Sequence, residues 1–73
     1  MMVLMEEDCI VIGTIINDCR YRRWHHDLCY NEETDKYISL IVPTNNEKYL
    51  ESIEANSPVE SIVQAYIQAL KSR

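Results

Sequence analysis

The clearest pattern of hydrophobic and polar positions lies near the C-terminus. Apolar residues recur there at steps of three and four residues, as on one face of an α-helix. They are Val59, Ile62, Val63, Tyr66, Ile67 and Leu70. Just before them, Ser57 supplies a capping hydroxyl, Pro58 suits the first helical position and Glu60 completes a capping box. The pattern predicts a helix over residues 58–71.

A similar signal precedes this helix. Thr44 and Glu47 have the spacing of a second capping box, and Pro43 ends the element before it. A narrow apolar stripe follows among Glu and Lys residues: Tyr49, Leu50 and Ile53. We therefore expect a short helix over residues 45–55, joined to the last helix by a sharp bend.

Residues 37–42 form a β-branched, apolar run that ends at Pro43, which predicts a strand. Side chains alternate between the two faces of a strand, so Ile38, Leu40 and Val42 share one face. We expect the helices to cover that face.

A run of isoleucine and valine over residues 9–16, broken by Gly13 and Thr14, has two interpretations. β-branched side chains lose rotamer freedom in a helix, which favours a buried strand over residues 9–17. The alternative is a helix over residues 9–20, because the charges on either side would suit a helix dipole. These charges are Glu6, Glu7 and Asp8 in front, with Arg20, Arg22 and Arg23 behind. We prefer the strand.

Alternating residues within 19–30 allow a further strand, and the polar residues 31–36 would turn it back into the strand at 37–42. Together these elements predict an α+β fold in a single domain over residues 1–73. The simplest arrangement is a three-stranded antiparallel meander followed by two short C-terminal helices packed on one face.

The net charge of −5 narrows the classes of partner. Phosphate contacts need clustered cations, so direct binding to nucleic acid or to an anionic membrane is disfavoured and a basic partner is favoured. The apolar residues 1–5 are too few for a signal peptide and lack its positive charge, and no apolar run could span a membrane. We therefore expect a cytoplasmic protein whose three cysteines are reduced thiols.

The strongest candidate for a binding surface is a basic, aromatic segment. It comprises Arg20, Tyr21, Arg22, Arg23 and Trp24, with Tyr30 further along. Arg and Trp are enriched at binding hot spots, and arginines beside aromatic rings also suit phosphates and stacked bases. The alternative is structural: the arginines would be solvated, or would pair across a hairpin with Glu32, Glu33 and Asp35.

A metal site is a second candidate in the same region. Cys19, His25, His26 and Cys29 fall close together in the sequence and have the side-chain types that zinc prefers. Their spacing matches no zinc finger, knuckle or ribbon, because there is no Cys-x-x-Cys pair and no His-x3–5-His pair. We expect ordinary thiols and imidazoles here, and no metal or other cofactor.

Catalysis has little support in the sequence. A dyad of Cys29 with His25 or His26 could carry nucleophilic chemistry, but it would also need an oxyanion site and a cleft. Gly13 is the only glycine, so no glycine-rich phosphate loop exists. We expect a protein that is not an enzyme and has no catalytic residues.

Two classes of function remain. The first is a small acidic protein-binding or regulatory module that contacts its partner through the basic, aromatic segment. It could also pair with itself through Val59, Ile62, Val63, Tyr66, Ile67 and Leu70. The second is an inhibitor of a nucleic-acid-handling enzyme, of the kind that phages and mobile elements direct against restriction or CRISPR systems. Its carboxylates would stand in for phosphates, which requires the fold to align them. An exposed Arg/Trp patch would favour the first class, and a ridge of aligned carboxylates the second.

Overall fold

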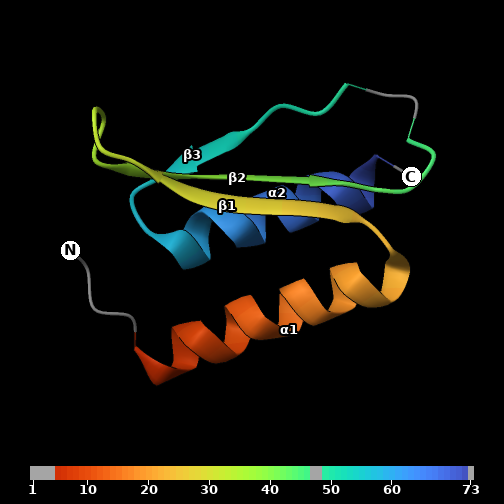
Figure 1. Cartoon of the computed structure of the whole chain (residues 1–73), viewed down its shortest axis with the longest axis horizontal. Coiled ribbons are helices and arrows are strands. Elements are labelled where there is room, and N and C mark those ends of the chain that lie inside the picture. Colours follow the sequence, from red (N-terminus) through yellow and green to blue (C-terminus); the bar gives the residue numbers. More distant parts are fainter. Residues whose placement is uncertain (1–4, 47–48, 73) are drawn as a thin grey trace.

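The chain folds in the order helix, three strands, helix. The elements of the computed structural model are α1 (Glu6–Arg22), β1 (His25–Asn31), β2 (Lys36–Val42), β3 (Ile53–Ala55) and α2 (Pro58–Lys71). The structure describes residues 5–46 and 49–72. The strands form an antiparallel sheet in the order β1-β2-β3, and both helices lie on the same side of it (Figure 1). The α+β class and the three-stranded meander are thus confirmed, with one helix at each end of the chain rather than two at the C-terminus.

The first helix corrects the prediction of a strand over residues 9–17, and the alternative that we set aside is the right one. Acidic residues occupy the first turn of α1 and arginines the last, so both ends complement the helix dipole. The buried residues, Ile12, Ile15 and Cys19, follow one another at helical steps of three and four. The rotamer cost of isoleucine and valine is only a few tenths of a kcal/mol per residue, and burial and end charges outweigh it.

The predicted helix over residues 45–55 is also wrong where the structure describes it. Residues 49–52 form no regular element, residues 53–55 form β3, and residues 47 and 48 lie outside the described part of the chain. Ile53 pairs with Ser39 and Ala55 with Tyr37, so β3 supplies the second neighbour of β2. Thr44 is not an N-cap: its hydroxyl donates to the Arg23 carbonyl oxygen at 2.6 Å and ties this segment to the end of α1. Here tertiary pairing overrides a local capping signal.

The hairpin of β1 and β2 follows the prediction in part. The strands pair from His25 opposite Val42 to Asn31 opposite Lys36, and the polar residues between them turn the chain. The strand allowed over residues 19–30 starts only at His25, because α1 continues to Arg22.

The face of β2 that the helices cover is opposite to the expected one. Ser39 and Ile41 are fully buried, and the Ser39 hydroxyl lies 2.8 Å from that of Ser61 on α2. Ile38, Leu40 and Val42 therefore lie on the face away from the helices, where they are half-buried. The physical reason is close approach: the residues of α2 buried against the sheet include Ser61, Ala65 and Ala69. Small side chains there let α2 approach a serine on the strand.

The helix predicted over residues 58–71 is confirmed as α2. The Ser57 hydroxyl accepts the Glu60 N–H at 3.1 Å, as the capping box requires. The core lies between the sheet and the two helices, and its buried members are Ile12, Ile15, Cys19, Trp24, Ile41, Ile62, Ala65 and Ala69. Of the two helices described, neither has the length and apolar character needed to cross a membrane.

Candidate functional site

The fold gathers carboxylates at one end of the molecule. The start of α1, the β1–β2 turn and the start of α2 all lie at this end (Figure 1). The carboxylates are Glu6, Glu7 and Asp8 from α1, Glu32, Glu33 and Asp35 from the turn, and Glu60 from α2. All of them are exposed except Asp8, which is half-buried. We call this set the acidic end. Lys36 also lies at this end, 3.9 Å from Glu54 of β3.

Cations gather at the opposite end, where both helices finish. Arg20, Arg22 and Arg23 lie at the end of α1, and Lys71 lies in the last turn of α2. We call these four residues the basic end. The two helices run in the same direction (Figure 1) and each has acidic residues in its first turn and basic residues in its last. Each charge pattern complements its own helix dipole. Because the helices are parallel, their acidic first turns lie at one end and their basic last turns at the other, so the two ends of the molecule carry opposite charge.

The structure places Trp24, the aromatic centre of the predicted Arg/Trp contact surface, inside the fold. Trp24 is only 8% exposed and belongs to the core, where its ring centroid lies 6.4 Å from that of Tyr66. The Arg22 guanidinium lies over the indole, 4.9 Å from the ring centroid. The only tryptophan of a chain without phenylalanine fills the corner between α1 and the sheet. Its ring is thus largely closed to a partner.

The other predicted contact residues are divided between the two ends. Arg20, Tyr21 and Arg23 are exposed at the basic end, with Tyr21 88% exposed. Tyr30 lies at the far end of β1, where its hydroxyl donates to the Asp35 carboxylate and its ring packs 5.1 Å from that of Tyr37. This hydrogen bond raises the pKa of Tyr30. The fold thus does not bring the six residues into one surface.

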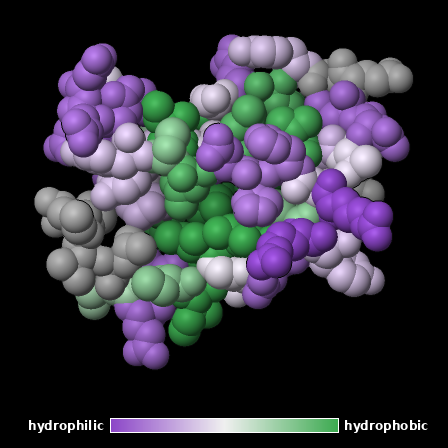
Figure 2. All heavy atoms as spheres, viewed as in Figure 1, coloured by the Kyte–Doolittle hydropathy of each residue, from purple (hydrophilic) through white to green (hydrophobic). Residues whose placement is uncertain are grey.

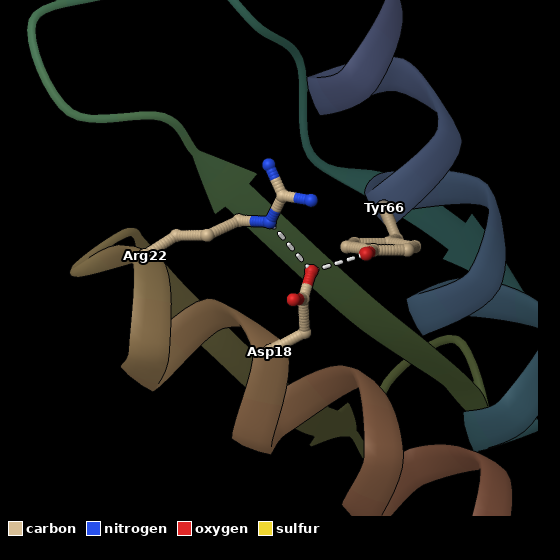
Figure 3. A network of polar contacts seen from close by, with 3 residues as sticks. All are labelled: Asp18, Arg22 and Tyr66. Carbon is tan, nitrogen blue, oxygen red and sulfur yellow. Dashed lines mark hydrogen bonds and ion pairs between the residues drawn. The ribbon is translucent and has the colours of Figure 1, made fainter.

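A polar network connects the two helices near the basic end. Figure 3 shows the Asp18 carboxylate between Arg22, also of α1, and Tyr66 of α2. Asp18 accepts the Arg22 Nε–H at 2.8 Å and also the Tyr66 hydroxyl. The Tyr66 hydrogen bond, with help from Arg22, lowers the pKa of Asp18 against the opposing effect of burial. The same bond raises the pKa of Tyr66.

This network is one that the sequence reasoning missed. The spacing of Asp18 and Arg22 at i and i+4 is a detectable signal once a helix is accepted there. The tyrosine from α2 could be identified only from the packing of the two helices. The neighbouring Cys19 is buried, and burial is the main reason that its pKa is raised. We call the contacts of Asp18 with Arg22 and Tyr66 the joint between α1 and α2.

The four candidate zinc ligands are not brought together. Cys19 is fully buried in the core, whereas Cys29 is exposed on β1. His25 and His26 are neighbours on a strand and so point to opposite faces. Cys29 shares a face with His25 but lies roughly 13 Å further along the strand. Within the described chain no three His, Cys, Asp or Glu side chains group as metal ligands would. The same geometry separates Cys29 from either histidine as a catalytic dyad.

The apolar stripe of α2 is mostly used inside the fold. Ile62 is 1% exposed, and Val59, Val63 and Tyr66 pack against the core. Ile67 and Leu70 remain exposed. An open pocket of about 480 Å³ lies where α2 faces the coil at Tyr49 and Leu50. Its described lining has no carboxylate, histidine or cysteine.

No protein-family model matches the chain, and no curated protein or solved structure is significantly similar to it. The separation of charge between the two ends is the clearest chemical feature that the fold creates.

Proposed function

We propose that the protein is a non-enzymatic binding module whose acidic end docks into a cationic groove on a nucleic-acid-handling protein and blocks access of nucleic acid to it. The main observation in support of this proposal is that carboxylates from three separate chain segments gather at one end. The sequence alone left these residues scattered, and the fold gathers the segments that carry them at one end.

The acidic end has the electrostatic properties that such a role needs. Within residues 5–46 and 49–72, Tyr30 is the one side chain that donates to any of these carboxylates. Neighbouring like charges, such as Glu6 beside Glu7 and Glu32 beside Glu33, repel one another and cost stability. A cationic groove that normally neutralises phosphates would relieve this repulsion, as it does for the nucleic acid it normally binds.

The competing proposal, a module that binds through the Arg/Trp segment, has less support. A binding hot spot buries an aromatic anchor in a pocket of the partner. Trp24 is already packed inside this protein, and Arg22 is held by Asp18. Arg20, Tyr21 and Arg23 remain available at the opposite end of the molecule, where they would form a different and smaller contact.

Binding to an immobilised arginine-rich peptide from a nucleic-acid-binding protein, in competition with duplex DNA, tests the proposed function. Replacing Glu6, Glu7 and Glu60 by Gln removes three charges from the acidic end and keeps the side-chain shape. We expect binding to weaken about tenfold, from charge contacts worth several tenths of a kcal/mol each. Binding should also weaken steeply with salt.

The matched control compares equal numbers of charges at different places. Replacing Asp27 by Asn and Glu51 by Gln should weaken binding less than about twofold, whereas replacing only Glu6 and Glu7 by Gln, which removes the same two charges from the acidic end, should weaken it about fivefold. Circular dichroism should be unchanged in both variants. Equal losses in the two variants would mean that only net charge matters, and would contradict a role for the acidic end.

A further inference from the structure

The outer edge of β1 is a long backbone edge with little of the usual protection. β1 pairs with β2 over its whole length, and nothing within residues 5–46 and 49–72 pairs with its other side. Natural edge strands are commonly protected by charged side chains, proline, bulges or short length. This strand, His-His-Asp-Leu-Cys-Tyr-Asn, has no proline and a single carboxylate, Asp27, and its register with β2 is unbroken. Its backbone groups are thus available to another strand.

Opposite charges flank the two ends of this edge. Arg23 lies two residues before β1, and Glu33 lies two residues after it. Both are exposed, and neither side chain has an ion-pair partner in the described chain. The alternative considered from the sequence, in which the arginines pair across the hairpin with these carboxylates, is ruled out by distance. The seven residues of β1 separate the two charges by roughly 20 Å.

We propose that a second copy of this chain pairs antiparallel with β1 and extends the sheet to six strands across a two-fold axis. The axis turns the second copy end for end, so the start of its β1 lies beside the end of β1 in the first copy. With Leu28 opposite Leu28 of the second copy, Arg23 of each chain lies near Glu33 of the other. The charges that cannot meet within one chain meet twice in the dimer.

One register satisfies both the backbone and the charges. Centring the axis on Leu28 pairs all residues of β1, with His25 opposite Asn31 and Asp27 opposite Cys29. Centring it on Asp27 would place two aspartates directly opposite each other, which is destabilising in an antiparallel pair. Centring it on His26 or on Cys29 would leave part of the strand unpaired.

The surface beside β1 fits a symmetric contact of this kind. Figure 2 shows hydrophobic side chains gathered through the middle of the face seen in Figure 1, between the sheet and α1, with hydrophilic side chains toward both ends. An apolar centre with a polar rim is the usual composition of an interface. An unrelated strand could use the backbone edge, but only a copy of this chain provides matching charges at both ends by symmetry.

A register-specific cross-link tests the geometry. In a Cys9→Ser background, Asp27→Cys places a thiol opposite the native Cys29 of the second copy, within disulfide reach in the proposed register. With oxidised glutathione as oxidant, we expect a covalent dimer by mass and by non-reducing electrophoresis. Adding Cys29→Ser should abolish this dimer. A monomer in the first variant, or a dimer that persists in the second, would overturn the register.

A charge swap tests the recognition. Sedimentation of the full chain should show a dimer that Arg23→Glu and Glu33→Arg each weaken about tenfold, whereas the double swap recovers to within about threefold of wild type. Lys71→Glu and Glu60→Arg change charge at the same ends away from β1 and should have less than about a twofold effect. A wild-type chain that stays monomeric to about 1 mM, or a swap that fails to recover, would overturn the proposal. Because no cationic partner is present, either result leaves the proposed function untouched.

Discussion

The two helices are held in the fold in different ways. α2 has one apolar face that packs along the sheet, where its small residues approach the strand closely and Ile62 is almost fully buried. α1 has apolar residues on more than one face, so that Ile12 and Ile15 are buried, Val11 at the edge of the buried face is partly exposed, and Ile10 on the opposite side is exposed. The comparison shows that apolar content alone says little about how firmly a helix is held. What matters is whether one face of the helix has a matching surface to pack against.

The attachment of α1 relies more on specific polar contacts. Asp18 joins it to Tyr66 of α2, and Arg22 packs over Trp24 at the corner where the chain enters the sheet. The contacts of Tyr66 and Arg22 with Asp18 depend on the charge of the Asp18 carboxylate, whereas the packing of α2 on the sheet does not. Changes in pH and in single polar groups should therefore act mainly through α1.

The largest difference between the helices should appear on truncating isoleucines. Ile62→Ala in α2 should lower the free energy of unfolding by about 3 kcal/mol, because it leaves a cavity in a closed core. Ile10→Ala, which removes the same atoms from the exposed side of α1, should change it by less than about 0.5 kcal/mol. Urea denaturation followed by circular dichroism measures both. Similar losses would show that the outer side of α1 is covered in solution.

A smaller effect is expected at the joint between the helices. Tyr66→Phe should cost about 1 kcal/mol of stability, because it removes the hydroxyl that Asp18 accepts while keeping the ring in the core. The pKa of Asp18 is lowered in the folded protein, so the ionised form contributes stability above the usual aspartate pKa near 4. That contribution is lost as the pH falls through the lower folded value. Unfolding measured from about pH 5 to pH 2 should show a shallower loss in Asp18→Asn than in wild type. Parallel curves for the two proteins would exclude this role of the joint.

The smallest effect should be a gain in stability. Gly13 lies inside α1 with no positive φ, and a methyl group added there would meet no atom of the rest of the protein within 4 Å, apart from its chain neighbours and the adjacent helix backbone. Gly13→Ala should therefore stabilise the protein by about 0.5–1 kcal/mol, through helix propensity and a less flexible unfolded chain. Thermal unfolding measures the shift. A loss of stability would mean that a partner or another segment approaches α1 closely at this glycine.

Elements whose signals were local and consistent could be predicted from the residues alone. The capping box and apolar face of α2 and the β-branched run of β2 needed no tertiary information, because each residue favoured the same local structure. The α+β class followed from them. The antiparallel meander was predicted with a strand over residues 9–17, which lie in α1, and its actual third strand was missed because Ile53–Ala55 is too short for its periodicity to be distinguished from a helical stripe.

Packing between elements sets which face of β2 is buried, where α1 packs and where the charges lie. Ser39 and Ile41 face α2 because a serine on the strand allows the small residues of that helix to approach closely. The pattern of β2 pointed to the other face, because Ile38, Leu40 and Val42 are all apolar. Trp24 became a core residue because the turn after α1 directs its ring inward. The carboxylates were scattered in the sequence and gather only because two parallel helices begin where the hairpin turns. A charge at a helix end or in a turn acquires its neighbours from packing, and packing joins residues that no local pattern connects.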